Sequence, residues 1–455
     1  MSAAAQMITQ SDNAPRVVIL GLGKTGFSCA KFLLQQGYDV VVADSRPTPP
    51  MESALRDLNS EVQIHTGGFD LNLLAGSELL VVSPGIASDK PIVCAAREKG
   101  LEIVGDVELF ARSVTQPVIA ITGSNGKSTV TALTGEMLQA AGKNVAVGGN
   151  IGTPVLDLPD QEHAELFVVE LSSFQLELTS SLKPLCATVL NLSADHMDRY
   201  TVIDDYARAK ARIFHNATVA LINRDDAVVR KMIAGQSVIT FGCDAPANQK
   251  DYGLVDIDGE SCLVRGDRKL MRLTEIPLPG LHGKMNALAA IALVESTGVE
   301  LNDAMRVAIA AFEGLPHRME IVGEWDGVQW INDSKGTNVG ATVAALKGLD
   351  APVILIAGGL GKDADFTPLH SACAHSARHV ILFGQDAGAI DHAIQGSTKI
   401  HRVDELASAI KKARELAQTG SVVLFSPACA SFDMFDNFEQ RGDVFRQLAL
   451  EMHEA

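Results

Sequence analysis

Basic residues are scarce in this sequence relative to acidic ones. Its 455 residues contain 38 Lys and Arg against 55 Asp and Glu, a formal net charge of -17. This acidic balance argues against general binding to nucleic acids or to anionic membranes. An anionic substrate would therefore need local basic side chains and backbone N–H donors.

The sequence also lacks paired cysteines, a secretion signal and a long apolar run. The seven cysteines form no C-x-x-C motif, which favours reduced thiols and a cytoplasmic protein. The opening residues MSAAAQMITQSDNAP have neither a basic n-region nor an apolar core, so we expect no secretory signal. No apolar stretch approaches the ~18 residues that a membrane span requires.

Short β-branched runs alternate with longer helical patterns along the chain. We expect strands at 16–20, 39–44, 79–84, 117–122, 166–171, 187–192, 219–223, 352–358, 379–384 and 421–427. Helical patterns between them include 24–36, 127–141 and 284–297. Strands that are apolar nearly throughout suit parallel sheets covered on both faces, which predicts an α/β fold. The polar, turn-rich stretch 243–272 predicts a small antiparallel excursion.

The strand–glycine–helix turn restarts twice, and the chain is too long for one ordinary domain. We therefore predict three domains with mostly parallel sheets. They are a Rossmann-like N-terminal domain at 1–106, a P-loop ATPase-like central domain at 107–313 and a Rossmann-like C-terminal domain at 314–455.

The first glycine-rich turn, VVILGLGKTG, places Gly21, Gly23 and Gly26 as G-x-G-x-x-G between a strand and a helix. Asp44 ends the next predicted strand. This pattern is typical of a turn that binds a nucleotide diphosphate at a helix N-terminus. Taken alone it favours NAD, with Asp44 on a ribose hydroxyl; a tight turn without a ligand is the other interpretation.

The second turn, AITGSNGKSTV at 120–130, lacks the first glycine of the familiar G-x-x-x-x-G-K-[ST] loop. The remaining groups suffice to bind a nucleotide triphosphate. The glycines let the backbone approach phosphate, Lys127 neutralises charge, and Ser128 or Thr129 can ligate Mg²⁺.

Two further stretches of the central block carry candidate metal ligands. FVVELSSFQLE places Glu170 at a strand end beside the phosphate loop, where a magnesium ligand belongs. In NLSADHMDRY, His196 lies beside Asp195 and Asp198. Magnesium prefers oxygen donors, so from coordination preference alone a structural His196 is the more ordinary interpretation.

The stretch YARAKARIF at 206–214 places Lys210 on an apolar face. On a helix, Tyr206, Lys210, Ile213 and Phe214 share one side. From the pattern alone, a Lys210 whose stem packs on that face and whose ammonium extends to solvent is the more ordinary interpretation. A buried lysine could instead be neutral and nucleophilic.

The C-terminal block is dense in groups that bind phosphate and ribose. WINDSKGTNVGAT places Asp333, Lys335 and Thr337 after a strand, and GLPHR supplies Arg318. Further groups come from GGLGKDADF, with Lys362, and from SPACASFDMFDNFEQRG, with Ser431, Phe438 and Arg441. Cys429 lacks a paired His–Asp pattern, which favours a buried thiol over a nucleophile.

Together GSNGKST, ELSSFQLE, DHMDRY, NDSKGTN and SPACASFDMFDNFEQRG resemble the Mur ligases of peptidoglycan synthesis, most strongly their D-glutamate-adding branch. The resemblance covers residues 15 to 450. It implies an ATP-dependent amide-forming ligase of the cytoplasm, expected as a monomer, with UDP-MurNAc-L-Ala and D-glutamate as substrates. The shortened phosphate loop is the form that this family uses.

The resemblance also implies a role for each matching position. Uridine would be held by Asp44, Ser45, Arg46, Ser83 and Gly85, and the sugar diphosphate or metal by Asn150, Ser172, Gln175 and His196. ATP would be held by Gly123, Asn125, Gly126, Lys127, Ser128, Thr129, Asn286, Arg318, Asp333 and Lys335. D-glutamate would be held by Thr337, Lys362, Ser431, Phe432 and Phe438. Two Mg²⁺ ions, with Mn²⁺ as an alternative, would be organised by Ser128, Glu170, His196 and a carbamylated Lys210. The catalytic group would comprise Lys127, His196, Lys210, Lys335 and Lys362.

One position departs from the family pattern. In HGKMN at 282–286, Gly283 stands where this branch often has a second amide side chain, which leaves one adenine or ribose contact without its residue. Three alternative functions remain open at this point. They are a Mur-type ligase for another amino acid, an NAD-dependent oxidoreductase with a regulatory ATP site, and a non-catalytic nucleotide-binding scaffold.

Overall fold

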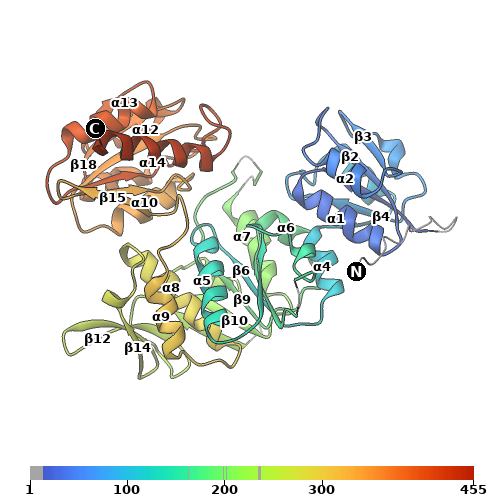
Figure 1. Cartoon of the computed structure of the whole chain (residues 1–455), viewed down its shortest axis with the longest axis horizontal. Coiled ribbons are helices and arrows are strands. Elements are labelled where there is room, and N and C mark those ends of the chain that lie inside the picture. The colour runs from blue at the N-terminus through green and yellow to red at the C-terminus, as the bar shows by residue number, and fades with distance from the viewer. Residues whose placement is uncertain (1–13, 162, 198, 201, 234–236, 455) are drawn as a thin grey trace.

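The computed structural model describes residues 14–161, 163–197, 199–200, 202–233 and 237–454. Three β-sheets follow one another along the chain, each in its own lobe (Figure 1). Most of their strands are parallel, so the predicted three-domain α/β fold is confirmed. Residues 1–13 of the opening segment in which we expect no secretory signal lie outside the described residues, as does Asp198.

The N-terminal sheet has five parallel strands in the order β3-β2-β1-β4-β5. This order, with a glycine turn after β1, is Rossmann-like. Its strands are β1 Arg16–Leu20, β2 Asp39–Asp44, β3 Gln63–Thr66, β4 Leu79–Val82 and β5 Glu102–Val104. Its helices are α1 Lys24–Gln35, α2 Glu52–Leu58 and α3 Pro91–Glu98, with the 3-10 turn η1 Leu71–Leu74.

The central sheet has nine strands in the order β14-β13-β12-β11-β10-β9-β6-β8-β7. Its strands are β6 Val118–Thr122, β7 Val145–Gly149, β8 Leu166–Glu170, β9 Cys186–Val189, β10 Val219–Asn223, β11 Ser237–Phe241, β12 Tyr252–Ile257, β13 Glu260–Arg265 and β14 Arg268–Arg272. The predicted antiparallel excursion is confirmed, because β12, β13 and β14 pair antiparallel.

The helices of this part of the chain are α4 Asp106–Ser113, α5 Lys127–Ala140, α6 Ser173–Glu177, α7 Ile203–Ala211, α8 Gly280–Glu295 and α9 Asp303–Ala311. The 3-10 turns described in this part of the chain are η2 Val155–Asp157, η3 Arg212–Phe214, η4 Val229–Lys231 and η5 Leu273–Glu275. The helical pattern over 206–214 is interrupted, since α7 ends at Ala211 and η3 follows. Tyr206, Lys210, Ile213 and Phe214 are nevertheless all buried, as that pattern predicted.

The C-terminal sheet has six strands in the order β15-β16-β20-β17-β18-β19, of which only the β15–β16 pair is antiparallel. The strands are β15 Glu320–Trp325, β16 Val328–Asn332, β17 Val353–Gly358, β18 Ala377–Phe383, β19 Lys399–Arg402 and β20 Val422–Phe425. The helices are α10 Val339–Lys347, α11 Pro368–Ser376, α12 Ala387–Ile394, α13 Leu406–Leu416 and α14 Phe438–Glu454.

The first two lobes share part of their buried core. One cluster of buried side chains runs from Val17 and Leu33 of the first lobe through Phe110 of α4 to Phe167 of β8. The rings of Phe110 and Phe167 meet edge to face with their centroids 5.3 Å apart. Helix α4 therefore joins the two lobes, as Figure 1 shows. Among the described residues, the helices are too short or too polar to cross a membrane.

Candidate active site

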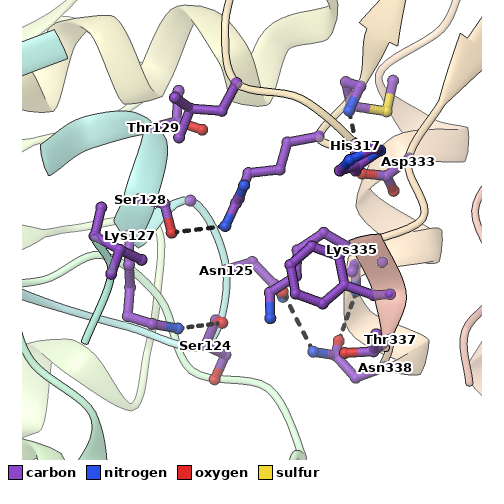
Figure 2. A pocket seen from close by; sticks show the side chains of 18 of the residues that line it. Ser124, Asn125, Lys127, Ser128, Thr129, His317, Asp333, Lys335, Thr337 and Asn338 are labelled. Carbon is purple, nitrogen blue, oxygen red and sulfur yellow. Dashed lines mark hydrogen bonds between the residues drawn. The ribbon is translucent and has the colours of Figure 1, made fainter. Parts of the chain in front are cut away.

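A cavity of about 920 Å³ lies where the central and C-terminal lobes face each other. One wall carries the phosphate loop and the ends of β8 and α7. The other wall carries the segment after β16 and the start of α14. Figure 2 shows Lys127 and Ser128 on the first wall, and Asp333, Lys335 and Thr337 on the second. Two segments about two hundred residues apart thus converge on one space.

The phosphate loop connects the buried strand β6 to helix α5. Gly126 precedes α5 with φ +81°, a left-handed conformation that favours glycine. A Cβ at this position would also lie 2.6 Å from Asn286 Oδ1, so the loop and α8 approach closely there. The Lys127 ammonium donates to the Gly123 and Ser124 carbonyls, at 2.9 Å each. The loop therefore keeps its one lysine folded against the backbone that would hold phosphate.

Glu170 ends β8 beside this loop, as the sequence predicted. Its Oε1 accepts a hydrogen bond from Asn150 Nδ2 at 2.7 Å. Its Oε2 is buried and has no hydrogen-bond partner among the described residues. A buried carboxylate oxygen left without a donor is costly, and it suits a position that faces a cation.

Lys210 is 1% exposed, so it does not extend to solvent. Its Nζ donates to the Gly123 carbonyl at 2.8 Å and lies 4.6 Å from the centre of the Tyr206 ring. Burial, reinforced by the positive charge of Lys127, lowers the Lys210 pKa well below its ordinary value. The neutral amine is therefore favoured at this position.

His196 occupies a left-handed turn with φ +57°. Its ring meets the edge of Phe174, with the centroids 4.9 Å apart, and lines the cavity. Burial lowers the His196 pKa, although the nearby Asp195 opposes the shift. A neutral imidazole is the form that can ligate a metal.

No group of three or more His, Cys, Asp or Glu side chains in the described part of the chain is arranged to hold an ion. The protein would thus supply only a few ligands, and phosphate oxygens and water would supply the others. Such shared coordination is usual for Mg²⁺ in nucleotide sites. This site fits Mg²⁺ because the unpartnered Glu170 oxygen and the Ser128 hydroxyl of the phosphate loop line the same cavity.

On the opposite wall, Arg318 crosses the cavity. Its Nη2 donates to the Ser128 hydroxyl at 3.2 Å. Burial lowers the pKa of the guanidinium somewhat, while Glu170 opposes that shift. Arg318 therefore brings a positive charge to the phosphate loop from the other lobe.

Asp333 and Lys335 follow β16 on the same wall. The Asp333 carboxylate accepts from Ser426 Oγ at 2.7 Å and from the Met319 backbone N–H at 3.2 Å. Burial raises its pKa to about 7. Solvent reaches Lys335 through the cavity, yet desolvation by surrounding protein and the charge of Arg318 lower its pKa to about 8. Its Nζ lies 4.1 Å from the centre of the Phe438 ring.

The cavity lining includes many of the predicted site residues. Central-lobe members are Asn125, Gly126, Lys127, Ser128, Thr129, Asn150, Glu170, Ser172, His196, Lys210 and Asn286, and C-terminal members are Arg318, Asp333, Lys335, Thr337 and Phe438. Three residues assigned to D-glutamate lie outside this lining. Lys362 is stacked 5.6 Å above the exposed Phe432 ring, and Ser431 is 2% exposed.

The predicted uridine residues lie in the N-terminal lobe, away from this cavity. The buried Asp44 carboxylate accepts from the Leu22 backbone N–H of the glycine turn at 2.7 Å and from Arg46 Nη2 at 2.6 Å. The Arg46 hydrogen bonds are the main cause that lowers the Asp44 pKa to about 2. Ser83 closes the turn from β4, with its hydroxyl 3.4 Å from the Gly21 carbonyl. Asp44 thus holds together the elements around the turn.

The departure from the family pattern at Gly283 has a local structural correlate. A Cβ there would lie 2.9 Å from Leu278 Cβ and 3.0 Å from its carbonyl carbon. A larger side chain would therefore require the segment before α8 to shift.

Sequence reasoning missed Asn338, which joins the two walls. Its Nδ2 donates to Asp195 at 3.1 Å and to Asn125 Oδ1 at 3.3 Å, while its Oδ1 caps α10. The capping position just before a helical pattern was a readable signal, because Asn is favoured there. Its contacts across the cavity were not, since they join residues 143 and 213 positions apart.

Comparisons with known proteins agree along the whole chain. Residues 15–105 match the description "Mur ligase MurD-like, N-terminal domain", 121–294 "Mur ligase middle domain" and 317–429 "Mur ligase, glutamate ligase domain". The UDP-N-acetylmuramoylalanine–D-glutamate ligase of Nitrosococcus oceani is 49% identical over 97% of this chain and 98% of its own. This chain belongs to the Mur ligase family.

Other relatives extend this result. The Methylobacillus flagellatus protein of the same name is 50% identical over 94% of this chain and 95% of its own. The solved UDP-N-acetylmuramate-alanine ligase of Thermotoga maritima is 20% identical, with a TM-score of 0.59 over 96% of this chain and 99% of its own. The latter shows the shared fold. This Mur ligase is therefore an ATP-dependent amide-forming enzyme, and an oxidoreductase or a non-catalytic scaffold finds no support.

Proposed function

We propose that this Mur ligase joins D-glutamate to UDP-N-acetylmuramoyl-L-alanine, with conversion of ATP to ADP and phosphate, in peptidoglycan precursor synthesis. The observation that carries the proposal is one cavity lined both by the phosphate loop and by the Asp333–Thr337 segment. Relatives 49% and 50% identical carry the corresponding name.

The chemistry requires activation of a carboxylate, which is a poor electrophile at neutral pH. Transfer of the ATP γ-phosphoryl group to the L-alanyl carboxylate gives an acyl phosphate and ADP. The neutral amine of D-glutamate then attacks the acyl carbon, and the tetrahedral intermediate expels phosphate as the amide forms. Such phosphoryl transfer depends mainly on positioning and on neutralisation of charge.

The side chains around the cavity suit these two tasks. Lys127 and Arg318 approach the phosphate loop from opposite walls and would neutralise the β- and γ-phosphates. Lys335, on the second wall, would neutralise the charge of the phosphoryl group during its transfer. Asn286 packs against Gly126 and would orient the nucleotide beside the loop.

Magnesium would be held by Ser128, Glu170, His196 and a carbamylated Lys210, and when bound it offsets the negative charge of ATP and the approaching carboxylate. The buried, neutral Lys210 amine can add CO₂ with loss of a proton. The product is an anion with oxygen donors, which Mg²⁺ prefers. We propose that these four residues organise two Mg²⁺ ions, which Mn²⁺ can replace.

The remaining assignments complete the substrate sites. Uridine would meet the Asp44–Arg46 segment and the Ser83–Gly85 turn. The sugar diphosphate would meet Asn150 and Ser172, with Gln175 behind Ser172. D-glutamate would meet Thr337, Lys362, Ser431, Phe432 and Phe438. One chain supplies both walls of the cavity, which supports a monomeric enzyme, and its nucleotide substrates suit a cytoplasmic location.

Phosphate release from ATP tests the proposal directly. With UDP-MurNAc-L-Ala present, we expect release to depend on D-glutamate and not on L-glutamate, and the product to contain a new amide. Release that depends instead on L-alanine or L-lysine would assign the chain to another branch of the family. Release that no amino acid stimulates would overturn the proposal.

A further inference from the structure

The first residue of α4, Asp106, is a buried carboxylate that the mechanism above does not use. It is 3% exposed. Its Oδ2 accepts a hydrogen bond from Gln175 Nε2 at 2.9 Å, and its Oδ1 has no partner among the described residues. Burial raises the Asp106 pKa to about 6, against the opposing effect of the Gln175 hydrogen bond. An ionised carboxylate at this place is unfavourable for folding, so packing alone does not account for it.

Gln175 connects Asp106 to the wall of the cavity. The Gln175 Oε1 accepts from the Ser172 backbone N–H at 3.0 Å and from the Ser172 hydroxyl at 3.1 Å. The Ser172 Oγ in turn accepts from the Gln175 backbone N–H at 3.2 Å, which completes a capping box for α6. Ser172 lines the cavity, whereas Gln175 is 4% exposed and lies behind it.

The direction of the Gln175 amide decides whether this arrangement holds. The oxygen and nitrogen of an amide occupy nearly the same volume, so packing does not distinguish the two orientations. The Asp106 acceptor opposite Nε2 and the Ser172 N–H opposite Oε1 both favour the orientation that turns Oε1 toward Ser172. With the amide reversed, its NH₂ group would face the Ser172 backbone N–H, and two donors would meet.

We propose that Asp106 is a positioning residue whose acceptor oxygen fixes the Gln175 amide and, through it, the Ser172 hydroxyl at the wall that binds the UDP-linked substrate. This inference rests on the proposed function for the identity of that substrate. It assigns Gln175 an indirect role behind Ser172 in place of direct contact with the sugar diphosphate.

Among the described groups around Asp106, the Asp106 carboxyl is the one whose charge changes near pH 6. Cys29 of α1 faces it, and burial followed by the charge of Asp106 raises the Cys29 pKa well above its ordinary value. Three ion pairs of the packed elements lie apart from Asp106. They join Lys31 of α1 with Asp157 of η2 at 3.2 Å, Glu177 of α6 with Arg199 at 3.2 Å, and Glu108 with Arg112 within α4 at 2.9 Å.

Steady-state kinetics of two variants tests the proposal. Asp106→Leu should raise KM for UDP-MurNAc-L-Ala about tenfold, as loss of one buried hydrogen bond implies, while KM for ATP stays unchanged. Asp106→Asn keeps an acceptor oxygen, so its KM at pH 8 should stay near that of the wild type. A folded Asp106→Leu protein with wild-type KM, or an Asp106→Asn protein whose KM rises as much as that of Asp106→Leu, would overturn the proposal.

Glu108 offers a matched control on the same helix. It is 1% exposed and accepts from the Ser180 and Ser181 backbone N–H groups, away from the cavity. Glu108→Gln should therefore leave both KM values unchanged. If it reproduces the effects of Asp106→Leu, those effects reflect general damage to α4 and the proposal is wrong.

A spectroscopic measurement separates this inference from the proposed function. The side-chain amide resonances of Gln175, assigned with Gln175→Glu, should differ from the wild type in Asp106→Leu and stay near the wild type in Asp106→Asn. This measurement needs no substrate. Absence of D-glutamate-dependent turnover would overturn the proposed function alone, whereas Gln175 amide resonances that Asp106→Leu leaves unchanged would overturn the positioning role alone.

Discussion

The guanidinium of Arg318 in the C-terminal lobe donates a hydrogen bond to the Ser128 hydroxyl in the phosphate loop of the central lobe, at 3.2 Å. This contact joins the two walls at the place where ATP phosphates would lie. Arg318→Ala should thus weaken ATP binding and turnover together, by about tenfold or more, since the lost donor is charged and partly buried. Titration of an ATP analogue measures the first effect and phosphate release the second. Arg306→Ala, on the exposed side of α9, serves as the control; equal losses in both variants would contradict a specific role.

Lys127→Ala should abolish ATP turnover and leave the fold intact. Its ammonium is held by two loop carbonyls, so no buried ion pair is lost. Phosphate release should fall to background, while the circular dichroism spectrum and Tm stay near those of the wild type. Lys143→Ala, just after α5, should retain full activity. Near-normal turnover of a folded Lys127→Ala protein would remove the loop from the mechanism.

Lys210→Ala should lose most activity, and small carboxylic acids such as formate or acetate should partly restore it by filling the vacated space. The reason is that the proposed carbamate is an anion, which these acids replace. Lys210→Arg should be inactive, because arginine keeps a positive charge and cannot form the carbamate. Arg208→Ala on the exposed side of α7 is the control. An active Lys210→Arg enzyme would show that the carbamate is not required.

Asp106 should also make the folded protein more stable as the pH falls, which is opposite to the usual effect of a carboxylate. Its folded-state pKa of about 6 lies above the ordinary value of 3.8, so the folded protein binds this proton more tightly than the unfolded chain. The Asp106 contribution to stability therefore grows as the pH falls from 7.5 toward 4.5, by about 2 kcal/mol at most. Urea unfolding of the central lobe at both pH values, compared between wild type and Asp106→Asn, measures it. If the two proteins show the same pH dependence, Asp106 does not titrate in this range.

Local patterns predicted most of the secondary structure and the character of the phosphate loop. The continuous Val and Ile runs of β1, β6 and β17 indicated parallel strands, because such runs suit burial on both faces. The glycines around Lys127 indicated a phosphate turn, and the apolar stripe around Lys210 indicated its burial. Strands such as β7 and β15, with glycine or charge inside them, gave weaker signals.

What the sequence by itself determined is the set of chemical groups and their local geometry. A glycine permits a left-handed turn and a buried stripe desolvates a lysine, and both effects act within one element and its immediate neighbours. Only the tertiary structure decided which distant groups meet: Arg318 with Ser128, Asn338 with Asp195, and Asp106 with Gln175. These contacts join residues 69 to 190 positions apart. No local periodicity encodes such pairs, because they depend on how whole sheets and helices pack together.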